Sequence, residues 1–304
     1  MNIHWEGNMK KLSAVLLFSF CFTAVLFAQD IFTLAKSGTP EQIQAAINAG
    51  AKVNDRDKDG WTPLMFAAQS NENPDVITTL LNAGAKVDDR DKYGRTPLMR
   101  AAALNKNPEV IKVLLDAGAK LDDRDKDGWT PLMCAACANK KPEVIKFLLN
   151  AGAKIDDKSM DGETPLMCAA LGTKNPDVIT ILLNAGAKID ERDKDGKTPL
   201  MRAAWFNENP DVITTLLNAG AKLEDRDNTG MTPLMCAAEC NKNPDVITTL
   251  LRAGAKIDDR DKYGRTPLMW AAMPFFNDNP AVIITTLLNA GADPTIKSGD
   301  GKTA

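Results

Sequence analysis

Hydrophobic and polar positions follow a pattern that recurs every 34 residues along this chain. Each unit opens with a charged turn, continues with a short apolar run that contains an Ala-Ala pair, and ends with a second apolar stripe. Thr-Pro-Leu-Met marks the first apolar run and begins at Thr62, Thr96, Thr130, Thr164, Thr198, Thr232 and Thr266. Self-similarity at this period predicts a solenoid in which neighbouring units cover one another's apolar faces.

One unit, residues 57–90, predicts two helices. Thr62 followed by Pro63 is typical of an N-cap and the first helical position. Asn73 and Pro74 repeat this pair before the second apolar stripe. That stripe has the spacing of a helix with one apolar side and consists of Val76, Ile77, Leu80 and Leu81.

Two glycines delimit the segment that joins one unit to the next. Gly84 stands where a C-cap glycine ends a helix, and Gly60 closes an Asp-rich turn in which glycine takes a positive φ without steric cost. The charged residues around this turn predict a hairpin-like projection, which we call a finger. The expected fold is mainly α: helix–loop–helix units joined by hairpin-like fingers.

The pattern DGWTPLM…AA…VITTLLNAGA resembles the ankyrin repeat, seven times over residues 57–297. This resemblance implies an ankyrin-repeat solenoid that is not an enzyme and that binds a protein partner through its fingers and first helices. The family usually carries a histidine that links repeats by hydrogen bonds, where this chain has Met65, Met99, Met133, Met167, Met201, Met235 and Met269. Methionine would replace that polar link by adaptable apolar packing. An Asn-x-Asn-Pro loop or a close variant replaces the usual glycine-containing loop between the helices.

The repeats have atypical flanks. Residues 29–56 lack Thr-Pro-Leu and carry extra polar side chains, as expected of an N-terminal capping half-repeat. In the seventh repeat, residues 273–276 lengthen the loop between the helices by two residues. Residues 298–304 begin a truncated further repeat. We expect the sequence to be a fragment that stops inside it; the alternative is that the last helix pair tolerates an open end.

The N-terminus has the features of a bacterial export signal. Lys10 and Lys11 precede an apolar run that ends at Ala28, which predicts a signal peptide over residues 1–28. We therefore expect a periplasmic or secreted protein without stable membrane insertion after cleavage. The alternative is an uncleaved anchor, because the 17 residues from Leu12 to Ala28 reach the lower limit for spanning a bilayer. Codons for residues 5–7 can form a bacterial ribosome-binding site, so Met9 is an alternative start.

Composition and charge favour a soluble protein that does not bind nucleic acid. The chain is 44% hydrophobic and 25% charged, which is ordinary for a soluble domain. Its net charge is −3, and removal of Lys10, Lys11 and Glu6 with the signal peptide would change this to −4. Acidic and basic residues are interleaved and form no basic stripe, so nucleic acid is not an expected partner.

Catalytic and metal-binding patterns are weak. The only histidine is His4, inside the predicted signal peptide, which excludes histidine-based catalysis and histidine metal ligands in the mature chain. Residues 55–60 and 123–128 match the start of a calcium loop, but Phe66 and Cys134 stand where an EF-hand needs a bidentate glutamate. We expect no cofactor, and we interpret the acidic residues as a solvated edge.

Five cysteines follow the predicted signal peptide: Cys134, Cys137, Cys168, Cys236 and Cys240. Cys134 and Cys168 hold the same place in successive repeats, about 8–10 Å apart by ordinary helix packing. A disulfide requires Cα atoms within roughly 7 Å, so we expect these cysteines to pack as small apolar residues. A thiol-based redox or metal-handling function that uses the helix cysteines is the alternative to a binding module.

Aromatic and cationic residues fall at places that vary between repeats, and these places carry the functional prediction. Trp, Tyr and Arg are enriched in binding hot spots, and exposed aromatic residues in a varied array suit an interface. We predict a surface for an unidentified protein partner that consists of Trp61, Tyr93, Arg95, Trp129, Lys197, Trp205, Tyr263, Arg265 and Trp270. The alternative is that these side chains only pack between neighbouring fingers.

Overall fold

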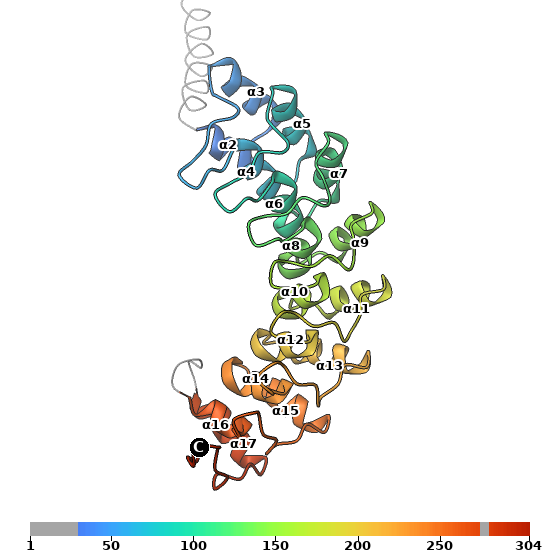
Figure 1. Cartoon of the computed structure of the whole chain (residues 1–304). Coiled ribbons are helices and arrows are strands. Elements are labelled where there is room, and N and C mark those ends of the chain that lie inside the picture. The colour runs from blue at the N-terminus through green and yellow to red at the C-terminus, as the bar shows by residue number, and fades with distance from the viewer. Residues whose placement is uncertain (1–29, 274–279) are drawn as a thin grey trace, which may run out of the picture. The chain divides into compact units, whose positions relative to one another are not determined.

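A computed structural model of the chain describes residues 30–273 and 280–304, and in this part all regular structure is helical (Figure 1). The expected mainly α solenoid is therefore confirmed. The predicted signal peptide lies outside the described residues, as does most of the expected insertion in the last repeat. Residues 30–56 form two helices that precede the first full repeat, α2 (Ile31–Ser37) and α3 (Pro40–Asn48).

Each of the seven repeats contributes two helices. The first helices are α4 (Pro63–Ser70), α6 (Pro97–Leu104), α8 (Pro131–Ala138), α10 (Pro165–Gly172), α12 (Pro199–Phe206), α14 (Pro233–Cys240) and α16 (Pro267–Ala271). The second helices are α5 (Pro74–Asn82), α7 (Pro108–Asp116), α9 (Pro142–Asn150), α11 (Pro176–Asn184), α13 (Pro210–Asn218), α15 (Pro244–Arg252) and α17 (Pro280–Asn289).

The caps read from the sequence define both helices of a repeat. The Thr62 hydroxyl accepts the backbone N–H of Met65 at 3.4 Å, and Asn73 caps α5 by accepting the N–H of Asp75 at 2.9 Å. Gly60 has a φ of 80° and Gly84 a φ of 91°, so both predicted glycine turns are confirmed. These local signals decide where each helix starts and stops.

The methionine that replaces the family's histidine belongs to the core. Along the stack these residues are exposed by 0 to 6% of their surface: Met65, Met99, Met133, Met167, Met201, Met235 and Met269. Paired alanines such as Ala67 and Ala68 are fully buried beside them, and the second helix contributes Val76, Ile77 and Leu80. Apolar packing therefore takes the place of the polar link, as expected.

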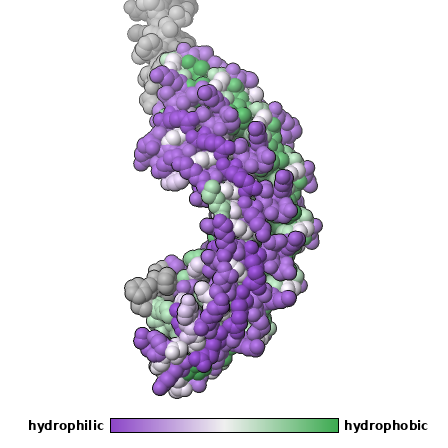
Figure 2. All heavy atoms as spheres, viewed as in Figure 1, coloured by the Kyte–Doolittle hydropathy of each residue, from purple (hydrophilic) through white to green (hydrophobic). Residues whose placement is uncertain are grey.

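The chain divides into two compact units, residues 1–101 with 109–119, and residues 102–108 with 120–304. In the second unit, the first helices α8, α10, α12, α14 and α16 succeed one another in one row and the second helices α9 to α17 in another (Figure 1). In the first unit, hydrophilic residues cover the fingers, whereas hydrophobic residues show along α3, α5 and α7 (Figure 2). The second unit is thus a two-row stack, and the first unit has a polar finger edge.

Arginine side chains connect one finger to the next. Arg56 donates to the carbonyl of Gly60 at 3.0 Å and to that of Arg90 at 2.8 Å, and it pairs with Asp89. The same set of contacts recurs at Arg124, Arg192 and Arg226. A backbone bond from Lys92 N–H to the Asp59 carbonyl at 3.0 Å runs in parallel. Successive fingers are therefore fixed in register.

Asparagine amides connect the first helices. The Asn207 amide donates to the carbonyls of Ala170 and Thr173 at 2.9 and 2.6 Å. Its own carbonyl accepts the N–H of Asn209 at 3.0 Å. The same bridge to the preceding repeat is made by Asn71, Asn139 and Asn241. The first asparagine of the Asn-x-Asn-Pro loop thus supplies a directional polar link at the C-terminal end of the first helix. The methionines lie in the first turn of the same helix.

The contact between α8 and α10 is built differently. Thr173 stands where the other repeats have this asparagine, and its hydroxyl donates to the Asn175 carbonyl within its own loop at 3.4 Å. A Cβ atom on Gly172 would lie 2.4 Å from the Cys137 Sγ and 2.5 Å from the Cys137 carbonyl oxygen. Glycine therefore lets these two helix ends approach more closely than any other residue would allow.

Asn207→Ala should destabilise the protein by about 1–3 kcal/mol, because the buried carbonyls of Ala170 and Thr173 lose a donor. Thr173→Ala is the matched control, since that side chain forms no bridge to the preceding repeat, and it should cost less than about 1 kcal/mol. Urea denaturation followed by circular dichroism measures both. Equal midpoints for the two variants would show that the amide bridge contributes nothing.

Candidate protein-binding surface

A carboxylate positions the variable residue in six of the seven fingers, and it is buried in five of them. Asp193 is 7% exposed, and its Oδ1 accepts the backbone N–H groups of Asp195 and Lys197 at 2.9 and 2.8 Å. Asp57, Asp91, Asp125, Asp227 and Asp261 do the same. In the fourth repeat, the Ser159 hydroxyl accepts the N–H of Glu163 at 3.1 Å. The residue four places after each of these acceptors is therefore held at a fixed point before the first helix.

In the first unit, cations cover the aromatic residues. The Arg100 guanidinium lies 3.7 Å from the centre of the Trp61 ring and pairs with Asp91. Trp61 is half-buried, whereas Tyr93 is 48% exposed. Arg95 lies 5.6 Å from the Tyr93 ring. Trp61, Tyr93 and Arg95 thus belong to one finger surface, on which Tyr93 offers most of the exposed aromatic area.

The structure describes Trp129 with the second unit, where it is half-buried. Its backbone N–H donates to Asp125 at 2.8 Å, as the same place does in other fingers. Its position beside Trp61, Tyr93 and Arg95 therefore stays a prediction from the repeat pattern.

Farther along the second unit, Lys197, Trp205 and their neighbours form one cluster. The Lys197 Nζ lies 3.5 Å from a carboxylate oxygen of Asp227 and 4.6 Å from the centre of the Trp205 ring. Lys197 itself is only 8% exposed. Trp205 stacks on Phe206 with ring centres 4.9 Å apart, and Phe206 is 51% exposed. Phe206 is therefore the accessible part of this cluster, and sequence reasoning did not select it.

The last repeat has a similar cluster, in which a cation lies beside aromatic rings. The Arg265 guanidinium lies 3.9 Å from the Trp270 ring and 4.7 Å from the Tyr263 ring, and it pairs with Asp261. Trp270 is 7% exposed, whereas Tyr263 is 61% exposed. Of the nine predicted contact residues, Lys197 and Trp270 are thus the most buried. These two side chains contact exposed neighbouring residues and offer a partner little accessible surface themselves.

Glu239 on α14 is a further residue that sequence reasoning missed. It is 8% exposed and accepts no hydrogen bond from any described residue. Burial raises the pKa of this carboxyl, the charge of Asp227 raises it further, and the charges of Lys197 and Arg265 lower it. The sequence does contain a sign of this residue, because Glu239 is the only acidic residue at its position of the repeat. The other repeats have Gln69, Ala103, Cys137, Leu171, Trp205 and Met273 there.

The cysteines are mostly buried and weakly acidic. Burial raises the pKa of the Cys168 thiol well above its usual value, and it raises the pKa of Cys240 to about 11. Burial also raises the pKa of Cys236. Nucleophilic and metal-binding cysteines act as thiolates, which these environments disfavour. Among the described residues, no three Cys, Asp or Glu side chains are grouped to hold a metal ion, so the redox and metal-handling alternative receives no support.

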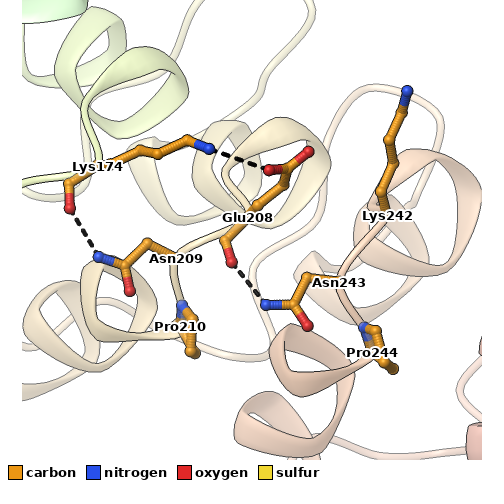
Figure 3. A pocket seen from close by; sticks show the side chains of 7 residues that line it. All are labelled: Lys174, Glu208, Asn209, Pro210, Lys242, Asn243 and Pro244. Atoms are coloured by element: carbon orange, nitrogen blue, oxygen red, sulfur yellow. Dashed lines mark hydrogen bonds and ion pairs between the residues drawn. The ribbon is translucent and has the colours of Figure 1, made fainter.

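An open pocket of about 520 Å³ lies at the loops that join the first helix of a repeat to its second helix (Figure 3). Neither a cysteine nor an aromatic residue lines it. Asn209 donates to the Lys174 carbonyl and Asn243 to the Glu208 carbonyl, both at 2.7 Å. Lys174 and Glu208 also form an ion pair at 3.1 Å. These contacts repeat from one loop to the next, so the pocket is a joint between repeats rather than a built ligand site.

Comparison with known families agrees with this architecture. The family model described as ankyrin repeats (3 copies) matches residues 31–125, 71–159, 102–193, 132–227 and 200–298. This chain belongs to the ankyrin-repeat family. Proteins of this family are generally non-catalytic protein–protein interaction modules. No curated protein matches this ankyrin-repeat chain. Its described helices are all too short or too polar to cross a membrane.

The environment of Glu239 gives a pH prediction. A folded-state pKa above the unfolded value of about 4.3 means that the folded protein binds the extra proton, so stability falls as pH rises between the two pKa values. Glu239→Gln should therefore raise the Tm at about pH 7 but not below about pH 4, where both states are protonated. Calorimetry over this range is the test, and an equal change in Tm at both pH values would contradict the assignment.

Proposed function

We propose that this ankyrin-repeat protein is a non-catalytic module that binds another protein through its fingers and the ends of its first helices. The observation that carries the proposal is the exposure of aromatic side chains at variable finger places, above all Tyr93 and Tyr263. Phe206 extends the same kind of surface to a first helix. Aromatic residues with one apolar face and fixed neighbours lose little entropy on binding, which suits them to hot spots.

The cations beside these rings support the same proposal. Arg95 and Arg265 lie within 6 Å of a tyrosine ring centre, at 5.6 and 4.7 Å, and Lys92 lies 4.9 Å from the Tyr93 ring, so each exposed ring has a cation as a neighbour. A fixed ring is preorganised for contact and loses less freedom when a partner binds. Buried packing between fingers would instead require the tyrosines to be covered, and both are more than 45% exposed.

We also propose that the protein works outside the cytoplasm. The support for this is the pattern of residues 1–28, which resembles an export signal; a chain exported by such a signal works in the periplasm or the medium. A chain that retains this segment as a membrane anchor is the alternative. N-terminal sequencing of the protein from a fractionated bacterial host decides between them: a start near Gln29 supports cleavage, and a start at Met1 or Met9 supports the anchor.

Changing Tyr93 and Tyr263 together to alanine should leave the fold intact, because the same finger place accepts Asp127 and Thr229 in other repeats. It should weaken partner binding by about 2 kcal/mol or more if these rings are hot spots. Partners are recovered by cross-linking on intact cells, and the affinity of the recovered partner is measured by calorimetry.

The matched control is Leu288→Ala, which removes an apolar side chain that is 42% exposed on a second helix. It should leave the affinity unchanged. If the double tyrosine variant binds as tightly as the wild type, recognition does not use the finger tyrosines. If the control weakens binding equally, the partner lies on the second helices instead.

A further inference from the structure

Glu239 lies between two tryptophans in the stack. Trp205 holds the equivalent place on the preceding first helix, and Trp270 lies on the following one. The thiol of Cys240, the next residue, contacts the Trp205 indole. Buried carboxylates in proteins are normally hydrogen-bonded or paired, because an unpaired buried charge is costly. Glu239 is 8% exposed and accepts no hydrogen bond from a described residue, but its carboxylate oxygens are not among the fully buried unpaired atoms, so a partner's side chain can still reach them.

The charges that face Glu239 do not balance it. Lys197 lies 3.5 Å from Asp227, and Arg265 lies 2.8 Å from Asp261. Each of these two cations is therefore committed to the carboxylate of a finger. Glu239 is the surplus acid of the group, and a third cation would neutralise it.

A buried donor and an apolar surface lie on the helices that flank this carboxylate. The indole N–H of Trp270 is buried and has no hydrogen-bond acceptor, whereas the Trp205 indole meets the Cys240 thiol. Phe206 is 51% exposed and stacks on Trp205, which holds the place equivalent to Glu239 on the preceding first helix, so these rings provide apolar area on the neighbouring repeat. Together, Trp205, Phe206, Glu239 and Trp270 form what we call the Glu239 surface. It offers a carboxylate acceptor for a cation and apolar area for an aliphatic chain.

We propose that the Glu239 surface binds an arginine or lysine side chain of the protein partner. The guanidinium or ammonium group donates to the Glu239 carboxylate, and the aliphatic part of the side chain lies against Phe206 and Trp205. Arginine and lysine combine a cationic head with an apolar stem, which matches this surface in both parts. An aqueous metal ion fits it less well, because among the described residues Glu239 belongs to no group of three or more candidate metal ligands.

This inference rests on the proposed function, since it names the chemistry of the partner for one part of the binding surface. It adds that recognition depends on a charge pair formed in a largely desolvated place. Removing one member of such a pair costs far more affinity than removing a charge at a solvated edge. Burial raises the pKa of Glu239 in the free protein, and a partner's cation would oppose this shift by favouring the ionised carboxylate.

The test uses a phage-displayed library of random peptides as the probe and the purified chain as the bait. Selected peptides are synthesised, and each arginine or lysine is replaced by its uncharged counterpart, citrulline or norleucine. Affinities are measured by calorimetry for the wild type, for Glu239→Gln and for Glu224→Gln. Glu224 is the matched control, because its carboxylate pairs with Lys256 at an exposed position, 3.1 Å away.

We expect binders enriched in basic residues, and a loss of about tenfold or more in affinity for Glu239→Gln or for the uncharged peptide. Glu224→Gln should change the affinity by less than about twofold. Equal losses in the two variants would overturn the proposal in favour of general electrostatics. Should Glu239→Gln fail to fold, as judged by circular dichroism, the comparison of charged and uncharged peptides on the wild type decides alone.

Failure of the inference can be told apart from failure of the proposed function. Peptides that bind equally to wild type and Glu239→Gln, but poorly to the double tyrosine variant, refute the basic partner and leave the binding module standing. A library that returns no binder counts against both.

Discussion

Each repeat carries an apolar face that only the next repeat can cover, and this constraint organises the molecule. The fully buried Met133 and the alanine pair on α8 have no solvent contact only because neighbouring helices lie over them. The helices of one repeat are eight or nine residues long, too short to be stable alone in water. Stability therefore resides mainly in the surfaces between repeats, and it accumulates with each added unit.

Polar groups give these surfaces their register. Asn207 fixes one helix end to the preceding loop, and Arg192 fixes one finger to the next. Asp193 accepts the backbone N–H of Lys197, the residue that varies between repeats. The same carboxylate also pairs with Arg202. The same buried framework thus presents a different side chain in each finger, which is how a repetitive scaffold can display a specific surface. Glu239 stands apart because its charge has no such partner.

Sequence alone predicted most of the fold, because its signals are local. Thr62, Pro63 and Gly84 determine helix ends within a few residues of themselves, and the period of the pattern determines the stacking. The bridge made by Asn207 escaped notice, since its acceptors lie 37 and 34 residues earlier and the loop reads as an ordinary cap. The exposure of Phe206 and the isolation of Glu239 likewise depend on neighbouring repeats. Helix propensity and residue spacing do not describe contacts between residues that are distant in the sequence.

Thermal unfolding of shortened chains tests the dependence on neighbours most directly. A chain that ends at Arg90 keeps α2 to α5 and leaves the apolar face of α4 and α5 open, whereas one that ends at Arg192 keeps α2 to α11. Circular dichroism should show a cooperative transition for the longer chain and no folded baseline for the shorter, because about three repeats are needed for a stable stack. A cooperative transition at a similar Tm in the shorter chain would contradict the account.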